Sequence, residues 1–300
     1  MVFTFMTLPP SEVLCAAGEP DPVHYTIHGD AIRFRANATD DDIAVLDTHR
    51  EVTTVAIGDG EGNGPEPWAI PIKITNQGFA HLANCKRLQT LELSFIQPLQ
   101  VTDEGLKALE DLKELRVIQL GVTPFTGAGL SHLTGPNVEE LWLDFNSHCD
   151  DAAMDSIANF TKLRVLRFHG APITDTGIAR IAGLSQLENL LLGKSRVGDN
   201  ALKIIGSFAK LKTLDLQYTR VTDAGMEQLK TLTKLQWLCV KGTAVTRKGL
   251  ANLTSLPELT SLYLDDTQAE NLPPDLAAKR TGQAQPAKAP DISPPPGLKR

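Results

Sequence analysis

Apolar residues, most of them leucine, recur along the chain with a period of 24 residues. The repetition is clearest in four consecutive segments, residues 173–196, 197–220, 221–244 and 245–268. The first half of a segment follows V-T-D-x-G-L-x-x-L-x-x-L, which places apolar residues at helical spacing. The second half follows L-x-x-L-x-L-x-x-T, and its L-x-L centre alternates as a short strand does. The pattern therefore predicts one helix and one strand in every repeat.

The same pattern extends toward the N-terminus. Five further units begin at residues 38, 74, 101, 125 and 149, and an insertion at 61–73 separates the first two. Neither the helix nor the strand of one unit can bury its apolar side alone, so the units must stack around one continuous core. We therefore expect nine repeats over 38–270, in an α/β solenoid. Its curved parallel sheet is expected on the concave face and its helices on the convex face.

The two ends of the array carry different sequences. Residues 23–37 contain two alternating runs around Gly29-Asp30, which predicts a hairpin that covers the first repeat. Residues 1–22 start apolar but lack a basic start and contain several prolines, so they make a poor secretory signal and are otherwise expected to be disordered. Residues 271–300 contain seven prolines and five basic residues against two acidic ones. This composition predicts a disordered, Pro-rich basic tail.

Two polar features recur at the start of the helical half. A Thr or an Asp, as in Thr174 and Asp175, can cap the helix by accepting a hydrogen bond from a free N–H. Gly recurs at the fifth place, as in Gly129 and Gly177, although Gly weakens a first helical turn. We infer that a neighbouring backbone passes close to this glycine.

These residues give the chain a family resemblance. The pattern resembles the leucine-rich repeat, and more narrowly the 24-residue T-D-x-G-L type of bacterial repeat proteins, akin to the cysteine-containing repeats of F-box receptors. It departs from the type at 125–148, where the strand of GPNVEELWLDFN comes one residue early. Cys85 stands where the cysteine-containing repeats carry their cysteine. The resemblance implies an α/β solenoid that binds other proteins, which is an analogy of fold rather than of site.

Composition excludes several classes of protein. The chain has 29 basic and 36 acidic residues, a net charge of −7, which is the wrong sign for nucleic-acid binding. No run of about 18 apolar residues exists, so we expect no membrane span. Four cysteines in 300 residues do not make a disulfide scaffold, and their lack of evident pairing favours a reducing compartment.

The sequence offers little for catalysis or metal binding. It lacks G-x-S-x-G, H-E-x-x-H and a lysine-containing phosphate loop. Residues 58–64, GDGEGNG, begin like a calcium loop, but Ile70 stands where that loop needs a bidentate glutamate. Residues 148–151, H-C-D-D, have no second ligand pair at zinc spacing, and a buried thiol is the simpler interpretation of Cys149. We therefore expect no enzyme activity, no cofactor and no metal.

The outward residues of the strands give the candidate binding surface, because equivalent positions stand in rows across the sheet. Trp142 and Arg167 are row neighbours, which is typical of an interface hot spot and also of a self-contained cation–π pair. Asp144 and His169 are neighbours two residues further along the strands, where they form half of a catalytic triad without a nucleophile. Glycines at 121 and 193 are expected to leave depressions beside them.

A second aromatic group is expected toward the C-terminal end of the same face. There Trp237 is placed near a cysteine and two tyrosines. Together with the first group, the candidate partner-binding residues are Glu140, Trp142, Asp144, Phe145, Arg167, His169, Tyr218, Trp237, Cys239 and Tyr263.

Three functions fit this surface. We expect a monomeric, cytoplasmic, non-catalytic scaffold that recognises an unknown protein partner on its concave face. The first alternative is an exported or cell-surface bacterial protein that binds a host or matrix component, favoured by the small residues before Glu19 and by three N-x-S/T triplets. The lower alternative is an F-box-type adaptor. It requires a helical F-box, of which only residues 8–14, LPPSEVL, give a faint resemblance.

Overall fold

A computed structural model describes residues 24–35, 37–58, 73–93, 100–121, 123–135, 137–270 and 272–280. The strands are β1 (Tyr25–His28), β2 (Ala31–Phe34), β3 (Thr54–Ile57), β4 (Thr90–Leu93), β5 (Val117–Leu120), β6 (Glu140–Trp142), β7 (Val165–Arg167), β8 (Asn189–Leu191), β9 (Thr213–Asp215), β10 (Trp237–Cys239) and β11 (Ser261–Tyr263). The α-helices are α1 (Asp40–Ile43), α2 (Asn76–Phe79), α3 (Gly127–Leu130), α4 (Ala153–Ile157), α5 (Asp175–Arg180), α6 (Asp199–Ile205), α7 (Asp223–Met226), α8 (Arg247–Leu250), α9 (Asp266–Ala269) and α10 (Pro274–Ala277). The 3₁₀ helices are η1 (Ala44–Asp47), η2 (Ala80–Asn84), η3 (Asp103–Leu109), η4 (Glu227–Thr231) and η5 (Ala251–Ser255).

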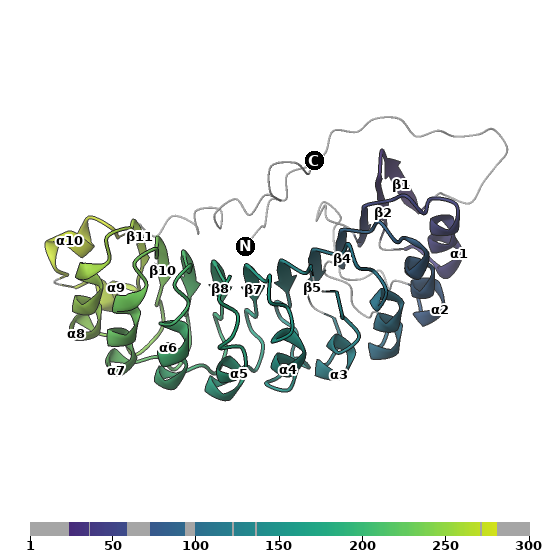
Figure 1. Ribbon diagram of the computed structural model, residues 1–300. Coiled ribbons are helices and arrows are strands. Elements are labelled where there is room, and N and C mark those ends of the chain that lie inside the picture. The colour runs from purple at the N-terminus through teal and green to yellow at the C-terminus, as the bar shows by residue number, and fades with distance from the viewer. Residues whose placement is uncertain are drawn as a thin grey trace.

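The strands form one sheet in sequence order, β1 to β11. Strands β1 and β2 pair antiparallel as a hairpin, and every later neighbour pairs parallel. The sheet lines the concave side of a curved array and the helices lie on its convex side (Figure 1). This is the α/β solenoid that the repeats predict, and the register pairs Trp142 with Arg167 as the rows require.

The helices are shorter and tighter than the apolar spacing suggests, because the chain must turn back to the next strand after a few residues. Several helices continue after their first turn as a 3₁₀ helix instead of an α-helix. The 3₁₀ helix rises more per residue than the α-helix. The threonines cap these turns: Thr126 and Thr174 each accept a hydrogen bond from the backbone N–H two residues later. The aspartates instead form hydrogen bonds with the next repeat.

In five of the described repeats an aspartate binds the threonine of the next repeat. Asp103 Oδ1 accepts the N–H of Thr126 at 2.8 Å, and Asp103 Oδ2 accepts its hydroxyl at 2.5 Å. Asp151 holds Thr174 in the same way, as do the aspartates of three other repeats. The recurring glycine makes room for this carboxylate, since a Cβ at Gly177 would overlap Asp151 Oδ1. The expected neighbour of the glycine is therefore mainly a side chain of the preceding repeat, not only its backbone.

Two repeats break the glycine pattern, and one of them shows that it is coupled between neighbours. Ala153 takes the glycine place, and the preceding repeat has Gly127 instead of aspartate, where a Cβ would lie 2.7 Å from Ala153 N. Ala201 also takes the glycine place. There the threonine becomes Gly198, whose N–H alone binds Asp175, at 2.6 Å. At Ala153 the change at the glycine place is matched by Gly127 in the preceding repeat. At Ala201 the accompanying change, Gly198, lies in the same repeat, and the preceding repeat keeps Asp175.

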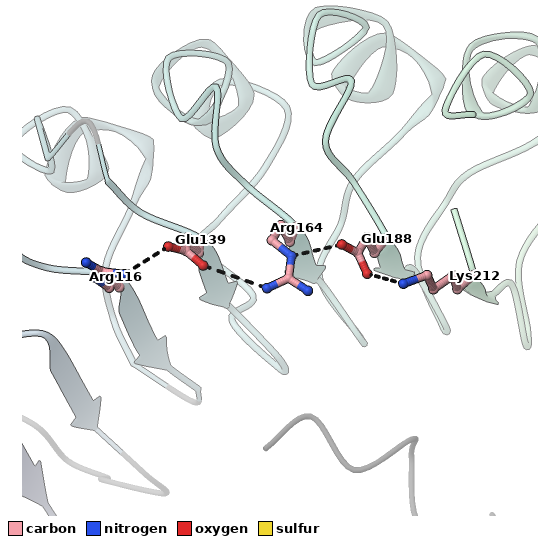
Figure 2. A network of polar contacts seen from close by, with 5 residues as sticks. All are labelled: Arg116, Glu139, Arg164, Glu188 and Lys212. Atoms are coloured by element: carbon pink, nitrogen blue, oxygen red, sulfur yellow. Dashed lines mark hydrogen bonds and ion pairs between the residues drawn. The ribbon is translucent and has the colours of Figure 1, made fainter. Parts of the chain in front are cut away.

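The strand-entry edge of the sheet carries a ladder of alternating charges, formed by Arg116, Glu139, Arg164, Glu188 and Lys212 (Figure 2). Each residue stands just before one of the strands β5 to β9. Arg164 Nε donates to Glu188 Oε1 at 2.9 Å, and Arg164 Nη1 lies 3.8 Å from Glu139 Oε2. Lys212 Nζ lies 2.7 Å from Glu188 Oε2, and Arg116 Nη1 lies 3.4 Å from Glu139 Oε1. All five charges therefore pair with a neighbouring repeat.

The C-terminal end differs from the expectation of a disordered tail beginning at residue 271. Residues 272–280 are ordered: Leu276 in α10 is fully buried and Lys279 Nζ donates to Leu256 O. The backbone also binds, since Leu262 N–H donates to Lys279 O at 2.9 Å. Leu276, with the partly buried Leu272, packs on the core of the last repeat, despite the prolines around them. Residues 281–300, like residues 1–23, lie outside the described residues.

Candidate interaction surface

The centre of the concave face holds a three-residue arrangement built on β6 and β7. The guanidinium carbon of Arg167 lies 4.3 Å from the centroid of the Trp142 ring, so the predicted cation–π pair forms. Arg167 Nη2 also lies 2.5 Å from Asp144 Oδ2. Trp142 Nε1 and Arg167 Nε are buried and have no hydrogen-bond acceptor among the described residues. Because a buried unpaired donor costs about 1–3 kcal/mol, this group is polar but incompletely satisfied.

Phe145 follows directly after this group and is 45% exposed. Its ring meets the His169 ring edge-on, with centroids 5.0 Å apart. The Phe145 backbone has φ of 58°, a left-handed conformation that is rare for a bulky residue. The ring lies against Gly170, where a Cβ would sit 3.0 Å from Phe145 Cδ1. Because Gly170 has no side chain, the Phe145 ring can lie against it while the rest of the ring faces solvent.

The Asp144–His169 pair does not form as a side-chain pair. Asp144 Oδ1 accepts the backbone N–H of His169 at 3.0 Å, while its other oxygen is taken by Arg167. The His169 ring turns the other way, with Nδ1 3.7 Å from Asp215 Oδ2. The carboxylate that the catalytic interpretation needs is therefore engaged with Arg167, which attracts it more strongly than a neutral imidazole does.

The depression expected at Gly193 is filled. A Cβ at Gly193 would lie 2.7 Å from His169 Nδ1, 2.8 Å from Gln217 Cγ and 2.9 Å from Asp215 Oδ2. Gln217 completes the group by donating from Nε2 to Asp215 Oδ2 at 2.8 Å. The missing side chain thus lets three polar side chains converge rather than opening a pocket. At Gly121, in contrast, the one atom near a Cβ would be Asp144 O at 3.6 Å.

Glu140 begins β6 and is only 6% exposed. Burial raises the pKa of this carboxyl to about 7, and the nearby Arg164 and Arg167 offset only part of that rise. The cause is desolvation, which disfavours the ionised form. Glu140 therefore lies under the surface rather than on it, and it titrates near neutral pH.

The second aromatic group forms in part. Trp237 and Tyr263 stack with centroids 5.0 Å apart, and both rings are half-buried. Cys239 is buried and its thiol pKa is raised to about 12, first by burial and then by the charge of Asp215, so it offers neither a surface nor a reactive thiolate. Tyr218 lies apart from the stack in another role, described next.

Tyr218 is one of three described non-glycine residues whose backbone has the left-handed conformation, and the pattern of apolar positions does not predict them. Tyr218 and Lys194 have φ of 53° and 59°, and each takes the place that Phe145 has in its own repeat. Tyr218 is 50% exposed, and a Cβ at Gly242 would overlap its ring. The signal was present in the repeat alignment, because Gly170 and Gly242 occupy this same place with positive φ.

Within residues 148–151, which the sequence analysis considered as metal ligands, Asp150 and Cys149 have structural roles. Asp150 accepts the N–H of Ala152, and Cys149 is fully buried. No group of three or more potential ligands that could hold a metal ion occurs among the residues that the structure describes. The calcium-like residues after Gly58, Trp68 and the insertion lie outside those ranges. Within the same ranges, no helix is both long and apolar enough to cross a membrane.

Comparison with known proteins agrees with the fold. A family model described as Leucine Rich repeat matches residues 209–230. The solved structure of internalin C2 from Listeria monocytogenes str. 4b F2365 is 25% identical, with a TM-score of 0.52 over 62% of this chain and 74% of that chain. Internalin F of the same strain is 15% identical, with a TM-score of 0.44 over 83% and 84%. No curated protein matches the chain by sequence.

The 24-residue units, the parallel sheet, the family-model match and the likeness to internalin C2 identify the chain as a leucine-rich repeat protein. Its architecture is that of a protein-interaction scaffold, with a continuous sheet that presents side chains from many repeats.

Proposed function

We propose that this protein is a non-catalytic scaffold of the 24-residue T-D-x-G-L subtype, and that it binds a protein partner through the centre of its concave face. The observation that carries the proposal is the Trp142–Arg167–Asp144 group, with Phe145 exposed beside it. Trp and Arg are enriched in the few interface residues that dominate binding energy.

Two features argue against catalysis as the use of this site. The nearest histidine, His169, packs against Phe145 and approaches a buried aspartate that is already hydrogen-bonded to Gln217. The nearby thiol of Cys239 is held protonated by burial. A nucleophile paired with an activating base is the minimum that covalent catalysis requires.

The experiment compares proteins captured by the wild type and by a W142A/R167A double variant. The variant is first shown to be folded by its circular dichroism spectrum and melting temperature. Proteins retained by the wild type and lost by the variant support the central patch. A W237A/Y263A variant is tested beside it, because it removes the second aromatic pair, which is also a candidate binding site; the central patch is supported when capture is lost in W142A/R167A and kept in W237A/Y263A. If W142A/R167A captures an unchanged set, the central patch is not the binding site.

We further propose a cytoplasmic, monomeric protein. Cys85, Cys149 and Cys239 are free and buried, as is usual where thiols stay reduced. The mass of the mature chain tests the location, since removal of about 18 residues, as a signal peptidase leaves it, would place the protein outside the cytoplasm. Light scattering coupled to size-exclusion chromatography tests the oligomeric state.

A further inference from the structure

The strand-exit edge of the sheet, residues 144–145, 169–170, 193–194, 217–218 and 241–242, carries two protruding aromatic rings. Phe145 and Tyr218 are among the few large apolar side chains that are exposed within the described part of the chain. Both have positive φ, and both lie against a glycine of the next repeat. Non-glycine residues in this conformation are strained and tend to cluster where function requires them.

The charges at the same edge are unequally engaged. The acids are occupied inside the fold: Asp144 by Arg167, Asp215 by Gln217, and Asp265 by the N-terminus of α9 and the N–H of Gly242. The bases Lys194 and Lys241 are exposed and have no ion-pair partner among the described residues. The same holds for Arg196 and Arg220, in the loops that follow.

The arrangement puts one free cation between the two rings. Lys194 occupies the same row, and its Nζ lies 5.8 Å from the centroid of the Phe145 ring. Lys241 adjoins Tyr218, whose N–H donates to Lys241 O at 2.8 Å. On a chain with a net charge of −7, this edge is therefore locally positive. A positive patch on an acidic protein favours an acidic partner that the rest of the surface repels.

We propose that the strand-exit edge binds an extended acidic segment of a protein partner, with apolar side chains at Phe145 and Tyr218 and carboxylates at Lys194 and Lys241. This rests on the proposed function in taking the ligand to be a protein. Phe145 and Tyr218 are three strands apart, about 14 Å at the usual strand spacing. An extended peptide spans that distance with about four residues. The segment thus has two apolar residues about four positions apart, with one acidic residue between them, at Lys194, and another beyond the residue at Tyr218, at Lys241.

The test is selection of a random dodecapeptide library displayed on phage, with the folded wild-type protein as bait. The expected peptides are enriched in Asp and Glu both between two apolar residues and just beyond one of them. The best one is synthesised with a fluorescent label, and its Kd is measured by polarisation. In a K194E/K241E variant the affinity falls about tenfold or more, and in F145S/Y218S by a similar factor. Raising NaCl from 0.05 to 0.5 M weakens wild-type binding, because exposed charges are screened.

The matched control is K234E. Lys234 is exposed in the turn before β10 and has no ion-pair partner among the described residues, so the charge change equals that at one of the edge lysines. Its Kd stays within twofold of wild type. Selection of peptides without acidic enrichment, selection of none, or unchanged affinity in K194E/K241E would overturn the proposal.

The W142A/R167A variant separates this inference from the proposed function. If the acidic peptide binds this variant as it binds wild type, while the variant still captures the wild-type set of cellular proteins, the strand-exit edge stands and the central patch fails. If peptide binding is lost in W142A/R167A but kept in K194E/K241E, the central patch stands and the strand-exit edge fails.

Discussion

The two edges of the sheet hold the repeats together by different means. At the strand-entry edge the exposed charges pair with one another, from Arg116 to Lys212. At the strand-exit side the joining groups lie deeper, where an aspartate of one repeat accepts two hydrogen bonds from a threonine of the next. The strand-entry edge therefore uses its charged surface residues for assembly. The strand-exit edge leaves Lys194 and Lys241 exposed and without an ion-pair partner among the described residues.

This division explains why strain is tolerated on one side only. The three non-glycine residues with positive φ, among those described, all lie at the strand-exit edge. Each costs of order 1–3 kcal/mol, which the aspartate–threonine contacts beneath can offset. A surface that does not have to stabilise the stack is available for binding.

The largest effect is expected from G177A, which places a methyl group against Asp151. We expect a loss of about 3 kcal/mol in the free energy of urea unfolding, since overpacking beside a fixed carboxylate displaces it from Thr174. The control is G183A, because a Cβ there meets nothing within 4 Å. It should change stability by less than about 0.5 kcal/mol.

A D151G/G177A double variant sharpens this prediction, because it copies the natural pair Gly127 and Ala153. The two single changes should not add: the coupling between them is expected to exceed about 1 kcal/mol. Additive losses would show that the glycine is not there to admit the carboxylate.

The next effect is the pH dependence due to Glu140. Its folded pKa of about 7 lies above the ordinary 4.5, so the folded protein holds this proton more tightly than the unfolded chain. Its contribution to stability is fully present below pH 4.5 and is lost as the pH rises through 7. Relative to E140Q, the wild type should lose about 2 kcal/mol between pH 4.5 and pH 8, allowing for partial solvation. Urea unfolding of both proteins at the two pH values measures this, and a constant difference contradicts it.

A smaller effect is expected from E188Q at the strand-entry edge. Hydrogen bonds from Arg164 and Lys212 outweigh burial and lower the pKa of Glu188. The ion pairs therefore stabilise the fold above the ordinary glutamate pKa of 4.5, and they fail as the pH falls through the lower folded value. We expect E188Q to cost about 1 kcal/mol at low salt and less in 1 M NaCl. A cost that does not change with salt would show that packing, not charge, is lost.

The smallest effect on stability is expected from K194E/K241E, the variant in which we expect the peptide affinity to fall about tenfold or more. K194E/K241E should shift the free energy of unfolding by less than about 0.5 kcal/mol, because neither lysine has an ion-pair partner among the described residues. Thermal melting beside E188Q makes the comparison. A larger loss than in E188Q would mean that the strand-exit edge also holds the stack.

The backbone arrangement could be predicted because it follows from periodicity. The 24-residue period fixes which residues share a row, and the pair Trp142–Arg167 follows from that register. Trp237 lies opposite Ser261, and its ring meets Tyr263 diagonally across the two strands. The choice of partner by Asp144 could not be predicted. It depends on which of two side chains reaches the carboxylate, and Arg167 reaches it while the His169 ring turns to Asp215.

The left-handed residues were also beyond a pattern of apolar positions. Phe145, Lys194 and Tyr218 look unremarkable singly, since residue type alone disfavours positive φ for each of them. The ordering of 272–280 was missed for a related reason: prolines dominate the composition, while two leucines pack on the core.

The coupling between neighbouring glycines and aspartates also restricts how such a chain can gain or lose units by recombination. Deleting residues 221–244 would join Asp199 to the repeat of Thr246 and Gly249, which has both residues that the aspartate needs. Deleting residues 125–148 would join Asp103 to the repeat of Ala153, which has Asp150 at the threonine place and an alanine at the glycine place. Units of equal length are therefore not interchangeable, and Gly127 and Ala153 form a seam that must be inherited together.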